Sequence, residues 1–371
     1  MENMETVPEF KLNRLRVAVI ALEFISPRHR TGGVSHYNHR LCMKLAEMGC
    51  DVTAITMNAY SGELGYKLLP LFEDKEVTNR FVRYYMAPIK GRTIDFADYD
   101  LVISSGDDWA MRRSEKTWIR IMHGSAYREV QHNKKWLRKL NLSLLYVLEL
   151  LSLRQSTVTL FNSKDTQTLY RSRLQDKVLH LPVDHQLFHP GEKAEDPAIL
   201  FVGALDSRKR GRLLRDLFIS EIKPKIPNAK LWMVCYPDEP HEGVTYYQSL
   251  STEQLAELYR KAHIYCMPST YEGFGLPYLE ALASGTLVVS TPNPGAVEIL
   301  GEGQYGVLAS DEGLASALID GLLSGDSFKD KVADGLEWAR SHSWEAVASE
   351  YLSYCPQWKG AGAMETAGAT Q

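Results

Sequence analysis

Two successive series of short apolar runs, each alternating with helix-like segments, constrain the fold of this chain most strongly. The first series comprises strand-like runs at residues 16–22, 51–56, 101–104, 118–122 and 157–161. Each run has the length and the branched side chains of a strand that is buried on both faces. Strands that alternate with helices predict a parallel, doubly wound α/β sheet.

A second series of the same kind fills the C-terminal half, with runs at residues 198–202, 230–234, 264–267 and 286–290. Between the two series, turn formers and charges gather at residues 183–196, as in an interdomain linker. We therefore expect two Rossmann-like domains, over residues 1–182 and 183–342, facing across a cleft at the carboxyl ends of the strands. The Gly- and Ala-rich tail, residues 357–371, is expected to be disordered.

Charge is distributed unevenly along the chain. Residues 1–180 hold 27 lysines and arginines against 20 acidic residues, a net charge of +7, whereas the whole chain of 371 residues has a net charge of −4. A basic half can face phosphates or a membrane surface, or it can be a solvated exterior. Lys134, Lys135 and Trp136 begin an apolar helical run that fits a helix at a membrane interface, although a core helix with a charged first turn is the simpler interpretation.

Several classes of protein are not indicated by the sequence. No run approaches the roughly 18 apolar residues that span a bilayer, and the acidic residues 1–10 contain no apolar signal region. We therefore expect a cytoplasmic protein, with peripheral contact to the inner membrane face as one option. The five scattered cysteines show no C-x-x-C spacing and predict neither disulfides nor a zinc site. No nucleic-acid partner is expected.

Residues 268–280 contain the richest pattern, with Glu272 and Glu280 on either side of Gly-Phe-Gly-Leu between a strand and a helix. Gly273 and Gly275 allow the backbone to approach a ligand closely, and the amides at the start of the helix form an anion site. Carboxylates accept hydrogen bonds, so sugar hydroxyls are natural partners. Glu272 precedes the helix and Glu280 lies more than one turn inside it, which indicates two distinct roles.

This segment resembles the signature of the retaining glycosyltransferases of family 4, which have the two-domain GT-B fold. The resemblance covers nearly the whole chain, through residues 16–33, 161–163, 183–190, 202–209 and 342–344. It implies that Glu272 binds the hydroxyls of the transferred sugar, that Glu280 binds the ribose, and that the backbone of Phe274, Gly275 and Leu276 contacts the donor. It also implies that a last helix, over residues 343–356, crosses back onto the N-terminal domain.

The basic loop after residue 202 has a direct physical rationale, because fixed cations stabilise a departing nucleoside diphosphate. The resemblance assigns Gly203 to donor binding and Lys209 to the diphosphate. The family commonly has an arginine directly after this glycine, and here that position is Ala204. Arg208, or alternatively Arg210, can supply the missing charge; a solvated basic loop is the plain alternative.

In the N-terminal half, the resemblance places Gly32 on the acceptor side, Gly33 at the donor and His123 near the reacting sugar. A simple turn and a structural histidine are the alternatives. Neutral imidazole at His123 can donate or accept a hydrogen bond, with no role as a nucleophile. No Asp-x-Asp metal motif is present, and the nearest pair, Asp107 and Asp108, is interpreted as a helix start.

These patterns and the resemblance together predict a hexosyltransferase of glycan biosynthesis that moves a sugar from a nucleotide-sugar donor to an acceptor hydroxyl on a glycan or lipid-linked precursor. The resemblance alone implies that the transfer proceeds with retention and without a metal. Neither a metal nor another cofactor is expected. The departing diphosphate takes the acceptor proton, and closure of the cleft excludes water. Two alternatives remain. One is a sugar-nucleotide epimerase on the same fold, for which no acid–base set is clear, and the other is a non-catalytic nucleotide-sugar-binding protein, which Ala204 mildly favours.

Overall fold

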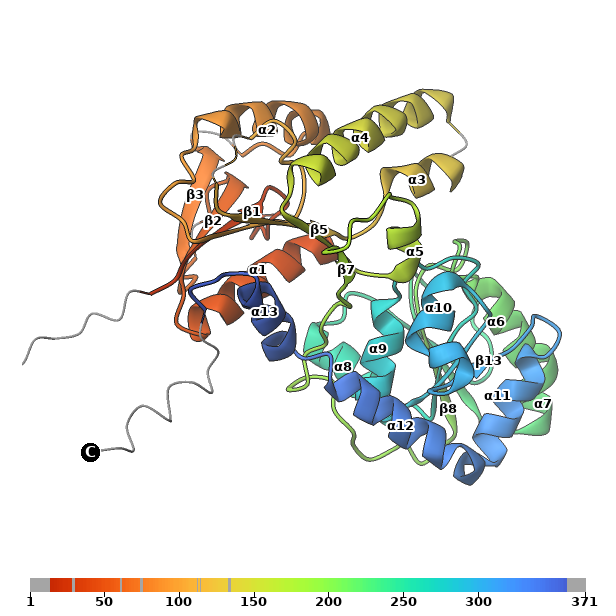
Figure 1. The fold of residues 1–371 in the computed structure, drawn as a ribbon. Helices are drawn as coiled ribbons and strands as arrows, with labels where there is room; N and C mark the ends of the chain where they lie inside the picture. Colours follow the sequence, from red (N-terminus) through yellow and green to blue (C-terminus); the bar gives the residue numbers. More distant parts are fainter. Residues whose placement is uncertain are drawn as a thin grey trace, which may run out of the picture. The chain divides into compact units, whose positions relative to one another are not determined.

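The computed structural model describes residues 14–28, 31–60, 62–73, 76–111, 113, 115–132 and 135–358. Residue contacts divide the chain into two compact units (Figure 1). Unit 1 comprises residues 1–160 and 348–371, and unit 2 comprises residues 161–347. The tail predicted to be disordered lies outside the described residues from position 359 onward.

The first sheet has seven strands in the order β3-β2-β1-β4-β5-β6-β7. The central strand β1 pairs in parallel with β2 and with β4. Its strands are β1 (Arg16–Ala21), β2 (Asp51–Asn58), β3 (Lys67–Phe72), β4 (Leu101–Ser104), β5 (Thr117–Met122), β6 (Val158–Phe161) and β7 (Lys177–Val178). All five strands predicted from apolar runs are confirmed. The sequence missed the two edge strands, because β3 contains a proline and β7 has two residues.

The second sheet has six strands in the order β10-β9-β8-β11-β12-β13. The strands are β8 (Ala198–Val202), β9 (Lys230–Val234), β10 (Val244–Tyr247), β11 (Ile264–Met267), β12 (Leu287–Ser290) and β13 (Val307–Leu308). The four predicted strands are confirmed, and the short edge strands β10 and β13 were missed. Side chains of one strand alternate between two cores, since Ile199 and Phe201 join one cluster and Leu200 joins the other. Both faces of this sheet are therefore covered, as in a doubly wound domain.

Helices connect the strands in both units. In chain order up to residue 168 they are α1 (Gly33–Glu47), η1 (Val82–Met86), α2 (Ala87–Lys90), η2 (Gly91–Thr93), α3 (Ala126–His132), α4 (Trp136–Gln155) and α5 (Lys164–Thr168). The later ones are α6 (Gly211–Leu217), η3 (Phe218–Ile222), α7 (Lys223–Lys225), α8 (Thr252–Lys261), α9 (Leu276–Ala283), α10 (Pro294–Ile299), η4 (Gly301–Gly303), α11 (Leu314–Leu323), η5 (Gly325–Phe328), α12 (Lys329–Arg340) and α13 (Trp344–Ser353).

The division between the units falls earlier in the chain than the predicted linker at residue 183. Residues just after β6 contact α10 and the loop before α9: the Lys164 N–H donates to the Glu298 carboxylate at 3.0 and 2.9 Å, and Tyr271 Oη donates to Asp165 at 2.8 Å. The edge strand β7, in contrast, is hydrogen-bonded in the first sheet. Near the end of α13, Tyr351 Oη lies 2.6 Å from Tyr37 Oη within unit 1.

The helix start predicted at Asp107 and Asp108 is wrong. The described residues between β4 and β5 contain no helix, and Asp107 has a left-handed backbone with φ of 56°. Asp108 is fully buried and accepts a hydrogen bond from Trp118 Nε1 at 2.9 Å and another from Ser152 Oγ. The carboxylate that sequence reasoning assigned to a helix cap therefore binds side chains distant in the sequence.

Both sheets reverse their strand order at one place, between β1 and β4 in the first sheet and between β8 and β11 in the second. At such a switch point, the loops at the carboxyl ends of the two strands diverge and leave room for a ligand. The predicted site residues follow the strands around these two switch points, apart from His123, which follows the neighbouring strand β5.

Candidate functional site

The loops after β8 and β11 form the switch-point site of unit 2. The loop after β11 ends at Gly275, the residue before α9, where φ is +88°. A Cβ atom at Gly275 would lie 2.4 Å from Tyr278 Cδ2, so both backbone conformation and space require glycine here. As predicted, Glu272 precedes the helix and Glu280 lies within it.

Glu272 and Arg208 form an ion pair in this site. Arg208 Nη2 donates to Glu272 Oε2 at 2.8 Å, and Arg208 Nε donates to the Tyr271 carbonyl at 2.9 Å. Ser269 Oγ donates to the other carboxylate oxygen, Oε1, at 3.1 Å. The Glu272 side chain is 7% exposed whereas the Arg208 side chain is 52% exposed. The Glu272 carboxylate is therefore buried and fixed by Ser269 and Arg208, whereas the Arg208 guanidinium is partly open to solvent.

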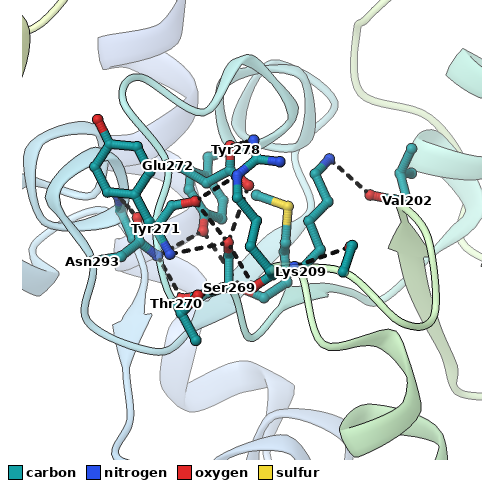
Figure 2. A network of polar contacts seen from close by, with 12 residues as sticks. Val202, Lys209, Ser269, Thr270, Tyr271, Glu272, Tyr278 and Asn293 are labelled. Carbon is teal, nitrogen blue, oxygen red and sulfur yellow. Dashed lines mark hydrogen bonds and ion pairs between the residues drawn. The ribbon is translucent and has the colours of Figure 1, made fainter. Parts of the chain in front are cut away.

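Lys209 lies near the same carboxylate. Its ammonium donates to the Val202 carbonyl at 3.1 Å (Figure 2). The Lys209 side chain also packs against Gly203, where a Cβ atom would lie 2.5 Å from Lys209 Cδ. Burial lowers the pKa of Lys209, and Glu272 and Glu280 oppose this effect because both carboxylates are close enough to attract the ammonium. Four of the predicted charged residues therefore interact electrostatically at one switch point.

Arg210, the alternative source of positive charge, is committed elsewhere. Its guanidinium makes two hydrogen bonds to Asp311, at 2.7 and 2.8 Å, and one to the Pro268 carbonyl at 2.5 Å. Its backbone is left-handed, with φ of 53°. Bidentate pairing fixes the guanidinium in place. Arg208 is therefore the better candidate for the charge that Ala204 does not provide.

Sequence reasoning missed the residues that support the glutamate loop from behind. Gly295 N–H donates to the Glu272 carbonyl at 2.8 Å, and a Cβ atom at Gly295 would lie 2.5 Å from the Phe274 carbonyl oxygen. Asn293 caps α10 by accepting from Ala296 N–H and also donates to the Ser269 carbonyl at 3.2 Å. The sequence Asn-Pro-Gly at 293–295 is a recognisable helix start and could have located this support.

The remaining predicted residues of unit 2 have distinct surroundings. Phe274 is buried and its ring contacts that of His180, with centroids 5.6 Å apart. Leu276 is the first residue of α9 and Glu280 is the fifth, and both are half-buried. The predicted residues Gly32, Gly33 and His123 belong to unit 1 and form a separate group.

Gly32 and Gly33 lie where α1 begins, after the loop that follows β1. A Cβ atom at Gly32 would lie 3.1 Å from Glu23 Oε1, whereas one at Gly33 would have no atom within 4 Å. The N-cap residue of α1 is Gly32, which has no side chain to cap the first amides, and the first turn of the helix contains no acidic residue. The first backbone donors of this 15-residue helix therefore receive no side-chain cap from Gly32.

His123 directly follows β5 and lies in a cavity of about 290 Å³. Its Nε2 is 2.8 Å from Ser105 Oγ, and the Tyr37 ring packs against it edge-on at 4.8 Å. Burial lowers the pKa of His123 to about 3, and the nearby Arg120 contributes to this effect. The imidazole is therefore neutral around pH 7 and can only exchange hydrogen bonds.

Sequence reasoning missed Glu23 and Asp107, which line this cavity, and Arg83, which contacts both of them. Arg83 Nη1 lies 2.6 Å from Glu23 Oε2, and Arg83 Nε lies 3.6 Å from Asp107 Oδ2. Burial raises the pKa of Asp107 to about 6, although Arg83 and Arg120 act in the opposite direction. No local motif indicates these residues, because they come from three separate segments of the chain, and Arg83 lies in η1. Glu23 also lines a second cavity of about 550 Å³ that includes Gly32.

Asp108 also lines the cavity around His123, and its carboxylate pairs with two arginines. Arg113 Nη2 lies 3.3 Å and Arg120 Nε lies 3.9 Å from its carboxylate. Burial would raise the pKa of Asp108, but Arg120 and Arg113, with hydrogen bonds from Ser152 and Trp118, outweigh it and lower the pKa. The buried charge is therefore compensated by two cations.

Comparison with known proteins identifies the second unit. Residues 196–324 match the family described as "Glycosyl transferases group 1". The chain contains a glycosyltransferase group 1 domain. That stretch includes all the predicted donor-site residues of unit 2, with Gly203 near its start and Glu280 well inside it.

Curated proteins similar to this chain match it over part of their length. An MMP alpha-(1->4)-mannosyltransferase from Mycolicibacterium hassiacum is 29% identical over 196 residues, which is 47% of each chain. The O-antigen chain mannosyltransferase B of Escherichia coli is 29% identical over 168 residues, covering 42% of this chain and 44% of the relative. The aligned stretch thus spans about half the length of these relatives. Neither relative favours the epimerase or the non-catalytic alternative.

Solved structures extend the likeness to nearly the whole chain. The sucrose-phosphate synthase from Thermosynechococcus elongatus has a TM-score of 0.71 and 20% identity, covering 91% of this chain and 97% of that one. The Anabaena protein HepE, solved with UDP and glucose, has a TM-score of 0.66 and 13% identity, covering 93% and 100%. These likenesses, with the two Rossmann-type sheets, confirm the predicted GT-B fold class.

Proposed function

We propose that this protein is a retaining glycosyltransferase that moves a hexosyl group from a nucleotide-sugar donor to a hydroxyl of a glycan or lipid-linked acceptor. The observation that carries the proposal is the contact of Arg208 with Glu272 beside Lys209, at the switch point of a glycosyltransferase group 1 domain. The HepE complex, which contains UDP and glucose, supports a nucleotide-sugar as the donor class.

Each charged residue of unit 2 has a separate proposed role. Lys209 and Arg208 bind the diphosphate and stabilise the negative charge that grows as it departs. The exposed guanidinium of Arg208 can turn toward a phosphate, which frees Glu272 Oε2 to accept hydrogen bonds from the sugar. Glu280 binds the ribose, and the backbone of Gly203 and of residues 274–276 contacts the donor.

The residues of unit 1 are proposed to act on the acceptor and on the reacting sugar. Neutral His123 exchanges a hydrogen bond with one of them, and Gly32 and Gly33 offer backbone amides. Charge neutralisation by Arg208 and Lys209 makes a metal unnecessary, and the departing diphosphate accepts the acceptor proton. Among the described residues, no group of three or more His, Cys, Asp or Glu side chains could hold a metal ion.

The proposed localisation is cytoplasmic, with peripheral contact to a membrane through the basic N-terminal half. No helix within the described part of the chain is long and apolar enough to cross a bilayer. A lipid-linked acceptor would be reached from the membrane surface. This part of the proposal rests on the +7 net charge of residues 1–180.

Substitution of Glu272 by Ala tests the catalytic assignment. Donors are first selected by thermal shift with nucleoside diphosphates and their sugars, since a ligand at 100 times its Kd stabilises the protein by about 2.7 kcal/mol. With a donor in hand, we expect Glu272→Ala to reduce transfer by more than about tenfold, because a carboxylate that binds hydroxyls in the transition state is lost. Glu312→Ala, at an exposed acid of the same unit, is the matched control.

Two results would refute the proposal. Transfer by Glu272→Ala within tenfold of the wild type would show that this carboxylate does not bind the sugar. Absence of any thermal shift with all nucleoside diphosphates and nucleotide-sugars would remove the donor class altogether.

A further inference from the structure

Helix α4 carries a stripe of large apolar side chains that remain exposed. The members, which are 39–71% exposed, are Trp136, Leu137, Leu140, Leu144, Val147 and Leu151. At 100° per residue, these positions fall within an arc of about 100° on the helix. Leu142 and Ser152 are buried on the other side, so α4 is anchored to unit 1 by one face and presents the stripe on the opposite face.

A second element extends this apolar surface. Phe81, Met86 and Ile89, on η1 and α2 or next to them, are 58%, 42% and 45% exposed. Tyr85 Oη in η1 donates to Asn141 Oδ1 in α4 at 2.8 Å, which joins the two elements side by side within unit 1 (Figure 1). We call these nine residues, six from α4 and three from residues 81–89, the α4 surface. So many exposed large apolar side chains on adjoining elements are uncommon on a soluble domain and indicate an interaction site.

Basic residues lie at both ends of α4 and directly after Ile89 of α2. Lys135, Arg138 and Lys139 flank the first turn of α4, Arg154 lies in its last turn, and Lys90 and Arg92 follow the apolar residues of α2. The sequence of η1, α2 and η2 contains no acidic residue, and α4 contains one. That residue, Glu149, turns inward and accepts from the Ala126 N–H at 3.2 Å. An apolar stripe with a cationic rim fits an anionic surface.

We propose that the α4 surface docks on an anionic lipid membrane. The apolar stripe enters the interfacial region while the basic rim contacts the headgroups, and the helix lies parallel to the surface without crossing it. Charge complementarity selects this occupant over a second copy of the chain. In a twofold dimer the same basic rim would face itself, and like charges would repel.

This proposal is independent of the donor chemistry, because the α4 surface contains none of the residues assigned to catalysis. Vesicle flotation tests it with the full-length protein, using phosphatidylcholine vesicles and vesicles containing about 30% phosphatidylglycerol. We expect the wild type to float with the anionic vesicles at least tenfold more tightly than with the neutral ones. Binding should weaken when the salt concentration is raised to about 1 M NaCl, because the Debye length falls from about 8 Å at 0.15 M to about 3 Å at 1 M.

Two variants separate the apolar and the electrostatic contributions. Leu140→Gln combined with Leu144→Gln should weaken binding to anionic vesicles at least tenfold. Lys135→Glu combined with Lys139→Glu should weaken it by a similar factor, because each basic residue near an anionic bilayer contributes about fivefold. Leu323→Gln and Lys225→Glu, at exposed sites of unit 2, are matched controls that should bind like the wild type.

The readouts identify each way in which the proposal can fail. Wild-type protein that does not float with either vesicle, or an apolar variant that floats as well as the wild type, overturns it. Wild-type dimers in light scattering that the Leu140 and Leu144 changes convert to monomers, without vesicle binding, would assign the surface to self-association and also overturn it. Unchanged melting temperatures and retained thermal shifts with nucleoside diphosphates show that each variant is folded and that the donor proposal is unaffected.

Discussion

The switch-point sites of the two units occupy the same place in two sheets of the same strand order, yet their supports differ. In unit 2, backbone contacts position the glutamate loop: Gly275 permits a left-handed turn and Gly295 packs against the carbonyls of residues 272 and 274. In unit 1, ion pairs between side chains position the site residues. Asp108 is buried between Arg113 and Arg120, and Arg83 lies between Glu23 and Asp107.

This difference explains why the sequence predicted the charged residues of the unit 2 site but not those of the unit 1 site. Glycines at fixed offsets around a helix start leave a local pattern, which the glycosyltransferase group 1 match also covers. Charge pairs between separate loops leave no such pattern. The fold supplies the location of a site, and the residues in its loops supply its chemistry.

The largest expected effect is on stability, from Asp108→Ala. This substitution removes the buried counter-charge that Asp108 provides to Arg113 and Arg120, which should cost about 3–5 kcal/mol in the free energy of unfolding by urea. Because the folded state lowers the pKa of Asp108, its ionised form stabilises the protein above its ordinary pKa, and this contribution is lost as pH falls through the folded pKa. Asp311→Ala, which removes a half-exposed partner of Arg210, should cost about 1 kcal/mol or less. Equal costs for the two changes would contradict an electrostatic scaffold in unit 1.

Gly295→Ala tests the backbone support of unit 2. The new Cβ would lie 2.5 and 2.9 Å from the carbonyl oxygens of Phe274 and Glu272, so the loop must shift. We expect a loss of about 1–3 kcal/mol in stability and nucleoside diphosphate binding weakened by at least tenfold in calorimetry. Gly273→Ala, whose Cβ would lie 3.5 Å from Tyr271 Oη, should change stability by less than about 0.5 kcal/mol. If Gly295→Ala binds nucleotide normally, the loop does not depend on this contact.

Arg208→Ala tests whether the exposed guanidinium contacts the diphosphate. A hydrogen bond to a charged group contributes about 1.5–3 kcal/mol, so the Kd for a nucleoside diphosphate should rise roughly 10- to 100-fold. Arg212→Ala is a control, because Arg212 is similarly exposed but pairs with Asp206 and Asp238. Equal effects of the two substitutions on the Kd would indicate a general loss of positive charge and would remove the specific role of Arg208.

The last expected effect is that of Asp107→Asn on pH dependence. The folded state raises the pKa of Asp107 to about 6, so it binds more protons than the unfolded state between pH 4 and 6. The wild type should therefore lose stability as pH rises through this window, by about 2 kcal/mol, and Asp107→Asn should flatten that change. Asparagine tolerates the left-handed backbone at this position, with φ of 56°. Identical unfolding curves for the two proteins across pH 4–7 would assign the change to other groups.

The sequence by itself determined both sheets, nine of their strands and the local geometry around Glu272. Apolar periodicity and glycine placement act over a few residues, so they can be read without knowing the fold. The short edge strands β7 and β13 were not predicted, because a strand of two residues shows no apolar periodicity. The helix predicted to start at Asp107 is wrong for a related reason. The sequence alone does not distinguish an aspartate that caps a helix from one that is buried among cations.

Only the tertiary structure decided which charges meet. Arg208 pairs with Glu272, 64 residues away, while the neighbouring Arg210 pairs with Asp311, 101 residues away. Burial of His123, and with it its neutral state, also depends on how β5 and its neighbours pack. Likewise, the apolar residues of α4 fit a core helix in sequence, and the structure leaves six of them exposed because nothing within the described part of unit 1 covers that face. These properties depend on which distant segments adjoin one another, and the order of residues along the chain does not encode that locally.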